Sequence, residues 1–362
     1  MAKIAAINQD RGIAPSRNKG AAVHLVAMRD AFTRLGCDVV AFDEPDDATL
    51  LSALSQGGAS QPFDLVYERY ALGSVTGAEF ARASGIPFVL EINAPLAEEQ
   101  HRFRGVAETK AQRESDNFLF RQADCVVAVS SAVAEYACAR GASPDAIMVC
   151  PNGVDAQRFN LHVDGAAVRR EYVPDGAFVI GFHGRLRPWH GFEQLVLVVS
   201  NLLARELPVH LLVVGDGEFN ALANLPDKHF TRVDWQPHAK VPKFVAAFDA
   251  LALTYHADAP FYYSPLKLME AMACGVVPLV PDLGDLSRLI DHGDNGFVYR
   301  AGDCSGLEKL LAELVVDVDE RQAIGRRAGE FAMAHSWNSI AANVLGRVRN
   351  DDQRRSRGGV RR

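Results

Sequence analysis

The stretch FYYSPLKLMEAMACGVVPLVPD, residues 261–282, carries the local signals that decide the fold. A polar, aromatic turn leads into residues 266–273, whose apolar side chains recur at helical spacing around a single acid, Glu270. Gly275 is expected to end that helix, and the apolar run at 276–280 is typical of a buried strand. A turn, a short helix and a buried strand in this order indicate an α/β fold.

The start of this helix has the chemistry of a phosphate site. Free backbone N–H groups and the positive end of the helix dipole favour an anion at a helix N-terminus. Lys267 lies in the first turn, where an anion would offset its charge, and Glu270 lies one turn further on, within reach of an attached ribose. We therefore predict a nucleotide-diphosphate site; the alternative is an ordinary core segment with Glu270 on a solvated face. The candidate donor-binding residues of this stretch are Tyr262, Ser264, Pro265, Leu266, Lys267 and Glu270.

Length and composition narrow the class of protein. The chain has 362 residues, 48% of them hydrophobic, which is enough for two domains. Its formal net charge of -7 argues against a general nucleic-acid binder. Six cysteines without a C-x-x-C pair suit reduced thiols in the cytoplasm. We find no membrane-span or signal-peptide pattern, so we expect a cytoplasmic protein; its basic C-terminal end leaves a peripheral contact with the inner membrane face open.

The first residues predict the opening unit of a doubly wound sheet. A strand at 3–8, a polar loop at 9–19, a helix that begins at Gly20 and a strand at 37–42 follow one another. In such sheets, ligands lie at the carboxyl ends of the strands. The dinucleotide fingerprint G-x-G-x-x-G is absent, which disfavours an NAD-dependent oxidoreductase.

Two polar side chains lie at the end of a later strand, residues 87–92. Glu91 and Asn93 would form a polar floor for a substrate there. Asparagine cannot act as a general base at neutral pH, so Asn93 is predicted to position a substrate by hydrogen bonding.

A second α/β unit begins at residue 177, where a strand precedes HGRLRPWHGFEQLV, residues 183–196. Arg185, Arg187 and His190 cluster on the loop between this strand and the next helix, which suits a diphosphate. The alternative is a solvated basic loop. Because the unperturbed pKa of histidine is about 6.5, phosphate binding through His190 is predicted to depend on pH. Substitution of Arg185 is predicted to reduce activity more than substitution of His190.

Five motifs occur in the order found in family 4 glycosyltransferases, and the sequence resembles that family over residues 3–349. The motifs are the Gly20 loop, PNGVD at 151–155, the loop 185–191, LLVVGDGE at 211–218 and SPLKLMEAMACG at 264–275. The resemblance implies the GT-B arrangement, two Rossmann-like domains facing across a cleft. It implies retaining transfer of a sugar from a nucleotide-diphosphate sugar to a hydroxyl acceptor, with no metal ion and no other cofactor.

The resemblance also implies roles for single residues. Gly20 and Ala21 would approach the donor diphosphate, and His24 would face the acceptor together with Glu91 and Asn93. The residues implied near the nucleotide base are Gly215, Trp235 and Gln236. Arg185 matches an arginine of the family, and His190 replaces its lysine. The candidate catalytic residues are Arg185, His190 and Asn93.

One position departs from the family pattern. Two glutamates eight positions apart flank the donor turn in the family; Glu270 matches the second, but Tyr262 stands at the first. A tyrosine hydroxyl cannot make the charged, bidentate contact of a carboxylate. The transferred sugar is therefore expected to be unusual, deoxygenated or held elsewhere, for example through Ser264.

The predicted domains are an acceptor-binding domain at 1–160, with a helix at 336–349 packing back on it, and a nucleotide-sugar-binding domain at 161–335. Residues 307–332 are expected to be helical, and 350–362 to be a basic disordered tail. A catalytically silent nucleotide-sugar-binding protein and a GT-B-type nucleotide-sugar epimerase remain alternatives. The acceptor stays open between a sugar, a phosphorylated polyol and a lipid-linked headgroup, and the base between uridine and guanosine.

Overall fold

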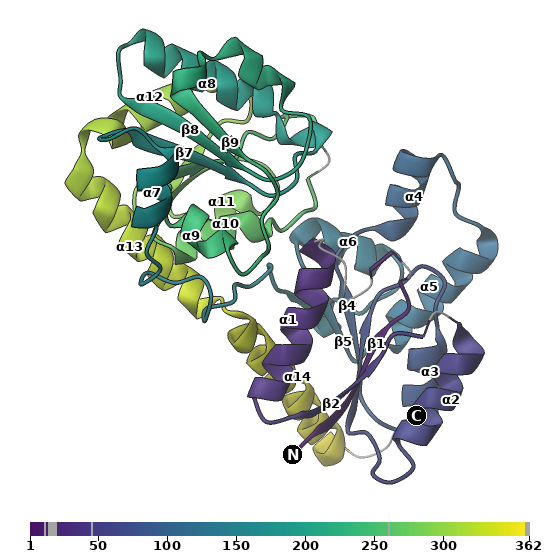
Figure 1. Cartoon of the computed structure of the whole chain (residues 1–362). Coiled ribbons are helices and arrows are strands. Elements are labelled where there is room, and N and C mark those ends of the chain that lie inside the picture. Colours follow the sequence, from purple (N-terminus) through teal and green to yellow (C-terminus); the bar gives the residue numbers. More distant parts are fainter. Residues whose placement is uncertain (11, 14–19, 45, 260, 359–362) are drawn as a thin grey trace. The chain divides into compact units, whose positions relative to one another are not determined.

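The computed structural model describes residues 1–10, 12–13, 20–44, 46–259 and 261–358, with side chains as far as residue 350. Packing divides the chain into two units. The N-terminal unit comprises residues 1–152, Tyr262–Ser264 and the helix that begins at Trp337, and the C-terminal unit comprises Gly153–Phe261 and Pro265–Ser336. Each unit is built on a parallel sheet flanked by helices (Figure 1).

A six-stranded parallel sheet in the order β2-β1-β3-β4-β5-β6 forms the N-terminal unit. Its strands are β1 (Lys3–Asn8), β2 (Asp38–Phe42), β3 (Leu65–Arg69), β4 (Phe88–Ile92), β5 (Cys125–Ala128) and β6 (Ile147–Val149). The helices are α1 (Gly20–Arg34), α2 (Asp47–Gly57), α3 (Thr76–Ser84), α4 (Leu96–Arg104), α5 (Lys110–Gln122), α6 (Ser131–Ala139) and the 3₁₀ turn η1 (Pro144–Ala146). The strands β1, β3, β4 and β5 are buried throughout, which accounts for their nearly continuous apolar sequence.

This strand order creates a switch point between β1 and β3. The chain passes from β1 to β2 on one side and then crosses to β3 on the other side. The loops that leave β1 and β3 therefore diverge at the carboxyl edge of the sheet. Open α/β sheets bind their ligands in the crevice at such a point.

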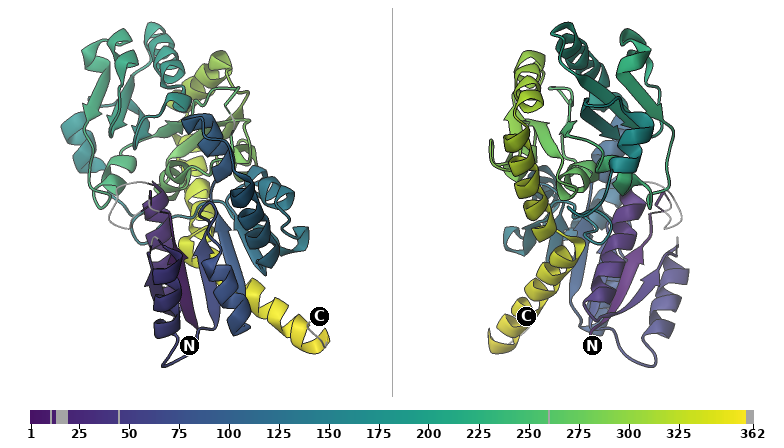
Figure 2. Two further views of the ribbon diagram at one scale, coloured as in Figure 1. Left: turned by 90° about the vertical axis from the view of Figure 1, so that its right-hand side faces the viewer. Right: turned by 60° about the vertical axis from the view of Figure 1, so that its left-hand side comes forward.

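The last helix, α14 (Trp337–Gly358), belongs to the N-terminal unit although it ends the chain (Figures 1 and 2). It contacts α1 and β5, and the ring of Trp337 lies 4.6 Å from that of His24. The helix runs past residue 349, where a disordered tail was predicted, because helix-compatible residues continue as far as Gly358. Residues 359–362 of the predicted tail lie outside the described residues.

The C-terminal unit has a second six-stranded parallel sheet, in the order β12-β11-β10-β7-β8-β9. Its strands are β7 (Phe178–His183), β8 (Val209–Val214), β9 (Phe230–Val233), β10 (Ala250–Ala252), β11 (Val277–Pro281) and β12 (Phe297–Tyr299). The helices are α7 (Ala166–Tyr172), α8 (Phe192–Ala204), α9 (Val241–Val245), α10 (Leu266–Ala273), α11 (Leu286–Leu289), α12 (Cys304–Val316) and α13 (Val318–Ala334), and the 3₁₀ turns are η2 (Pro188–His190), η3 (Asn220–Asn224) and η4 (Asp227–His229). The switch point of this sheet lies between β7 and β10.

The helix α10 has the bounds predicted from the sequence, residues 266–273. Its apolar side chains from Leu268 onward are buried in the core of the C-terminal unit, and Glu270 is only 8% exposed. Gly275 follows with a φ of 77°, the left-handed conformation that ends helices. Among the described residues, no helix is long and apolar enough to cross a membrane.

The unit boundary differs from the predicted one near residue 160. The chain changes unit after Asn152, because Val154 and Phe159 pack into the core of the C-terminal unit. Tyr262 instead packs into the core of the N-terminal unit, which therefore includes a three-residue segment from the middle of the chain.

The helical stretch predicted at 307–332 is two helices rather than one. Asp317 separates α12 from α13, and its side chain accepts a hydrogen bond from the backbone N–H of Glu320 at 3.0 Å. An N-cap of this kind starts a new helix and so ends the previous one.

Candidate functional site

In the C-terminal unit, the loops after β7 and β10 approach each other closely. Gly191, which precedes α8, has a φ of 55°, and a Cβ there would lie 1.9 Å from the carbonyl oxygen of Thr254. Thr254 Oγ1 also donates to the carbonyl oxygen of His190 at 3.1 Å. Both loops leave the sheet at its switch point, so glycine at 191 permits the approach that places His190 there.

Lys267 and His190 form the basic part of this site. Lys267 Nζ lies 4.3 Å from the centroid of the Phe182 ring. Burial lowers the pKa of Lys267 to about 7, although the nearby charge of Glu270 acts in the opposite direction. Burial, together with the charges of Lys267 and Arg187, lowers the pKa of His190 to about 2.

His190 is therefore a neutral donor rather than a titrating cation. Its Nδ1 accepts from the backbone N–H of Arg187 at 3.2 Å, so its proton lies on Nε2. The sequence predicted pH-dependent phosphate binding through a histidine with an ordinary pKa. The group of this pair whose pKa lies near neutrality is Lys267 instead.

Glu270 lies between two histidines that the sequence analysis did not select. His183 Nε2 is 2.9 Å from Glu270 Oε2, and His238 Nε2 is 3.2 Å from Glu270 Oε1. Burial raises the pKa of Glu270, but the hydrogen bonds and charges of the two histidines outweigh it and lower the pKa to about 2. Glu270 is thus an ionised acceptor held on both oxygens. The sequence feature that could have marked these two histidines as site residues is their position at, or shortly after, the end of a predicted strand.

The remaining candidates of this unit lie at the ends of β7, β8 and β9. Arg185 is paired with Asp216 at 2.9 Å, and both side chains are exposed. Gly215 has a φ of 142°, and a Cβ there would lie 2.2 Å from the carbonyl oxygen of Gly184, so the turns after β7 and β8 touch. Trp235 is 43% exposed. Gln236 donates to the carbonyl oxygen of Asp234 at 3.2 Å.

In the N-terminal unit, Glu91 is the centre of a buried polar cluster. It is 2% exposed and contacts His24 Nε2 at 3.0 Å and Arg69 at 2.9 Å, and it accepts hydrogen bonds from Tyr67 and Asn93. Burial acts to raise the pKa of Glu91, but His24 and Arg69 outweigh it and hold this pKa well below its usual range. Glu91 therefore positions His24 and Asn93.

Several predicted donor residues also belong to the N-terminal unit. Gly20 and Ala21 form the first turn of α1; part of the predicted loop before them, residues 11 and 14–19, lies outside the described residues. The backbone N–H of Asn152 donates to Ser264 Oγ at 2.7 Å, and the Asn152 side chain contacts His24 Nδ1, also at 2.7 Å. The backbone carbonyl of Tyr262 accepts from Ser130 Oγ at 2.9 Å.

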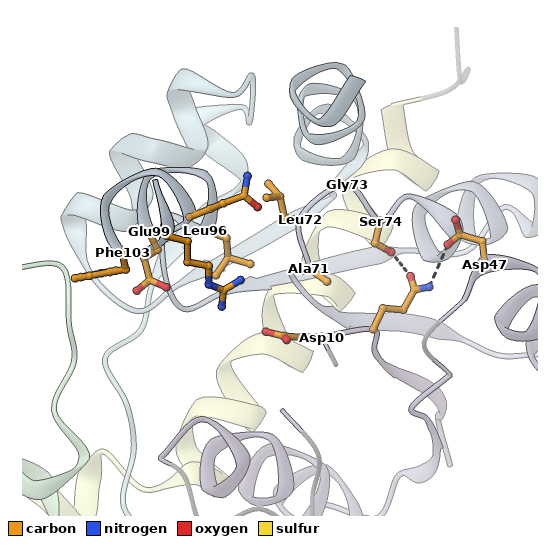
Figure 3. Close-up of a pocket in the computed structure, with 12 residues that line it drawn as sticks. Asp10, Asp47, Ala71, Leu72, Gly73, Ser74, Leu96, Glu99 and Phe103 are labelled. Carbon is orange, nitrogen blue, oxygen red and sulfur yellow. Dashed lines mark hydrogen bonds between the residues drawn. The ribbon is translucent and has the colours of Figure 1, made fainter. Parts of the chain in front are cut away.

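A cavity of about 440 Å³ opens at the switch point of the N-terminal sheet. Figure 3 shows its lining side chains around a common space. They come from the residues after β1, from the start of α2, from the loop after β3 and from α4. None of them is among the candidate site residues of the sequence analysis; they are polar and apolar residues of four separate segments.

The chain contains two doubly wound parallel sheets. At the edge of the second sheet lie Lys267, His190 and the carboxylate of Glu270, which contacts a histidine. Together these features define the GT-B class of glycosyltransferase. Two family models match the chain: Glycosyl transferases group 1 over residues 177–317 and Glycosyltransferase Family 4 over residues 43–158. The chain therefore belongs to the family of group 1, family 4 glycosyltransferases. It is an enzyme that transfers a sugar from a nucleotide sugar.

Among curated proteins, the chain is similar to the D-inositol 3-phosphate glycosyltransferase of Stackebrandtia nassauensis, at 27% identity over 82% of this chain and 71% of that protein. It is similar to the GDP-mannose-dependent alpha-mannosyltransferase of Mycobacterium tuberculosis, at 28% identity over 76% of this chain and 70% of that one. Among solved structures, Anabaena Alr3699/HepE in complex with UDP and glucose shares the fold, with a TM-score of 0.71 and 21% identity over 97% of this chain and 100% of that chain.

Proposed function

We propose that the protein is a retaining, metal-independent glycosyltransferase whose C-terminal unit binds the nucleotide-diphosphate sugar and whose N-terminal unit binds the hydroxyl acceptor. The observation that carries this proposal is the association of Lys267, His190 and Glu270 at the switch point of the C-terminal sheet. The first turn of α10, which contains Lys267, has no side-chain cap, so its N–H groups suit a phosphate. Glu270 suits the hydroxyls of a ribose.

The chemistry that these residues support is stabilisation of a leaving group. A nucleoside diphosphate departs with negative charge, and Lys267, the Nε2–H of His190 and Arg185 would donate to it. Arg185 is paired with Asp216, so a bound diphosphate would compete with this carboxylate for the guanidinium. By analogy with oxyanion-hole donors, loss of one donor would reduce turnover roughly 10²-fold.

Retention follows if the acceptor hydroxyl attacks the anomeric carbon from the face that the diphosphate leaves. The new carbon–oxygen bond forms as the bond to the phosphate breaks, and the hydroxyl proton passes to the departing phosphate oxygen. No protein nucleophile and no protein base is needed. Asn93, held by Glu91, would position the acceptor without taking its proton.

Metal independence rests on the cations that the chain itself provides. Lys267 and Arg185 would neutralise the charge that a divalent ion otherwise neutralises. We therefore expect product formation to be unchanged by a chelator such as EDTA. A loss of turnover with EDTA that is restored by Mg²⁺ or Mn²⁺ would contradict this part of the proposal.

The test of the donor site is a thermal-shift titration with UDP, GDP, dTDP, ADP and NAD⁺. A nucleotide at 100 times its dissociation constant adds about 2.7 kcal/mol of stability. We expect one nucleoside diphosphate to stabilise the protein and Arg185→Ala and Glu270→Ala to lose the effect. Arg170→Ala, at an exposed position of α7, is the matched control and should keep it. Stabilisation by NAD⁺ alone, or by none of the five, would overturn the proposal.

A further inference from the structure

The cavity of the N-terminal unit has a size and position suited to a small polar ligand. Its volume of about 440 Å³ falls within the usual range of ligand sites. It lies where the loops after β1 and β3 diverge, the point at which open α/β sheets bind ligands.

The charge of the lining is mainly negative. Among the described residues that line it, Asp10, Asp47 and Glu99 contribute three carboxylates, and Arg104 contributes one guanidinium. A carboxylate can only accept hydrogen bonds, so these three favour a ligand that donates them. A hydroxyl donates; a phosphate monoester at neutral pH carries about two negative charges and would meet repulsion instead.

The acceptors are held in place before a ligand arrives. Gln9 Nε2 donates to Asp47 Oδ1 at 3.1 Å, and the Gln9 side-chain carbonyl accepts from Ser74 (dashed lines in Figure 3). Asp47 Oδ1 also accepts from Thr76 Oγ1 at 2.6 Å. The carboxylate of Asp47, fixed in this way, would not turn out of the cavity to make room for an anion.

A buried carboxyl group, that of Glu68, lies next to these contacts. Glu68, on β3, is fully buried and lies 3.3 Å from Ser74 Oγ. Burial raises its pKa to about 8, and the charge of Asp47 acts in the same direction. At neutral pH Glu68 is therefore mostly protonated, chiefly because it is buried.

The lining also contains apolar side chains. Leu72, Leu96 and Phe103 line the cavity together with the carboxylates. A lining that combines apolar carbon with hydrogen-bond acceptors suits a ring with C–H faces and hydroxyl edges.

We propose that this cavity binds the acceptor as an uncharged polyhydroxylated ring, a sugar or a cyclitol, and discriminates against the phosphate ester of that ring. The proposal rests on the proposed transferase function. It separates this chain from relatives that are named D-inositol 3-phosphate glycosyltransferases. It also chooses the sugar or cyclitol among the acceptors that the sequence left open.

The test compares matched acceptor pairs in the full-length enzyme with the donor found by thermal shift. Pairs such as glucose with glucose 6-phosphate and myo-inositol with myo-inositol 3-phosphate are assayed for release of nucleoside diphosphate above the acceptor-free background. We expect the turned-over neutral acceptor to exceed its phosphate ester at least about 10-fold, a difference of about 1.4 kcal/mol. A phosphate ester that is used as well as, or better than, its neutral partner overturns the proposal, as does a panel in which no neutral member is used.

Charge variants identify the cavity as the cause. The double variant Asp10→Asn with Glu99→Gln keeps hydrogen-bond acceptors and removes two charges, so the preference for the neutral acceptor should fall at least about 3-fold. Asp30→Asn, at an exposed position of α1, is the control and should leave the preference unchanged. An unchanged preference in the double variant also overturns the proposal.

The experiment separates this inference from the function on which it rests. If no nucleoside diphosphate stabilises the protein, the transferase proposal fails first. If a diphosphate binds and the acceptor preference is reversed, only the cavity proposal fails.

Discussion

The hydroxyl of Tyr262 donates a hydrogen bond to Glu99, with 2.5 Å between the two oxygens. Tyr262 stands where a glutamate is expected in the family, and Glu99 lines the cavity of the N-terminal unit. Burial first, and then the contact with Glu99, raise the pKa of Tyr262, which keeps the hydroxyl protonated and able to donate. The tyrosine thus satisfies one acceptor of the cavity, which a glutamate at the same position could not do.

Substitutions of Tyr262 test this relationship. Tyr262→Phe should cost about 1.5–3 kcal/mol, because a partly buried hydrogen bond to a charged group is lost. Tyr262→Glu should cost more at pH 7, because a second carboxylate would face Glu99, and part of that cost should disappear at pH 5. Melting temperatures of the three proteins at both pH values measure this. A Tyr262→Glu variant that melts at or above the wild-type temperature at pH 7 would contradict the interpretation.

The contacts of Glu270 predict a dependence of stability on acid. Its pKa falls from 4.5 to about 2 on folding, so it contributes stability above pH 4.5 that is lost as the pH falls toward 2. The difference corresponds to on the order of 3 kcal/mol. Glu270→Gln should therefore remove this part of the acid-induced loss, as seen by melting from pH 6 down to pH 2.5. Asp319→Asn, an exposed change on α13, should leave the wild-type profile intact.

The pKa of Lys267 predicts proton uptake when the donor binds. With a pKa of about 7, most of the side chain is neutral at pH 8, and a diphosphate would favour its charged form. Calorimetric titrations at pH 8, in buffers with different ionisation enthalpies, should show close to one proton taken up per nucleotide. Lys267→Arg keeps a permanent charge and should bind with no such uptake. Equal uptake by both proteins would assign the proton to another group.

Two glycines of the same loop give a matched steric test. Both Gly184 and Gly191 have positive φ, but a Cβ at Gly184 meets nothing within 4 Å, whereas at Gly191 it meets the carbonyl of Thr254. Gly184→Ala should cost about 1 kcal/mol through the backbone conformation alone. Gly191→Ala should cost about 3 kcal/mol and weaken the nucleotide-induced thermal shift, because His190 must move. Equal effects on melting would show that the loop adapts freely.

Local signals predicted much of the fold. The helix at 266–273 and the strand at 3–8 have the predicted bounds, because apolar residues mark their interiors and Pro265 and Gly275 flank the helix. The helix α2 (Asp47–Gly57) was not predicted, because its sequence is short and weakly patterned. The unit boundary was placed too late, because packing, rather than composition, assigns Val154 and Phe159 to the C-terminal core.

Site residues that belong to one local sequence motif could be predicted. Contacts between residues that are far apart in the sequence could not. Glu270 and Lys267 were selected from their helix alone. His183 contacts Glu270 from 87 residues away, and Glu99 contacts Tyr262 across 163 residues. No local spacing encodes such pairs, because only the strand order brings them together.

The inclusion of residues 262–264 and α14 in the N-terminal unit has a consequence for engineering. Neither unit is a single uninterrupted piece of the gene product, so a fragment that ends at residue 152 lacks the helix that contacts α1 and β5. A chimaera built to exchange donor preference would have to transplant Gly153–Phe261 and Pro265–Ser336 as two inserts, and keep the recipient's own tripeptide between them.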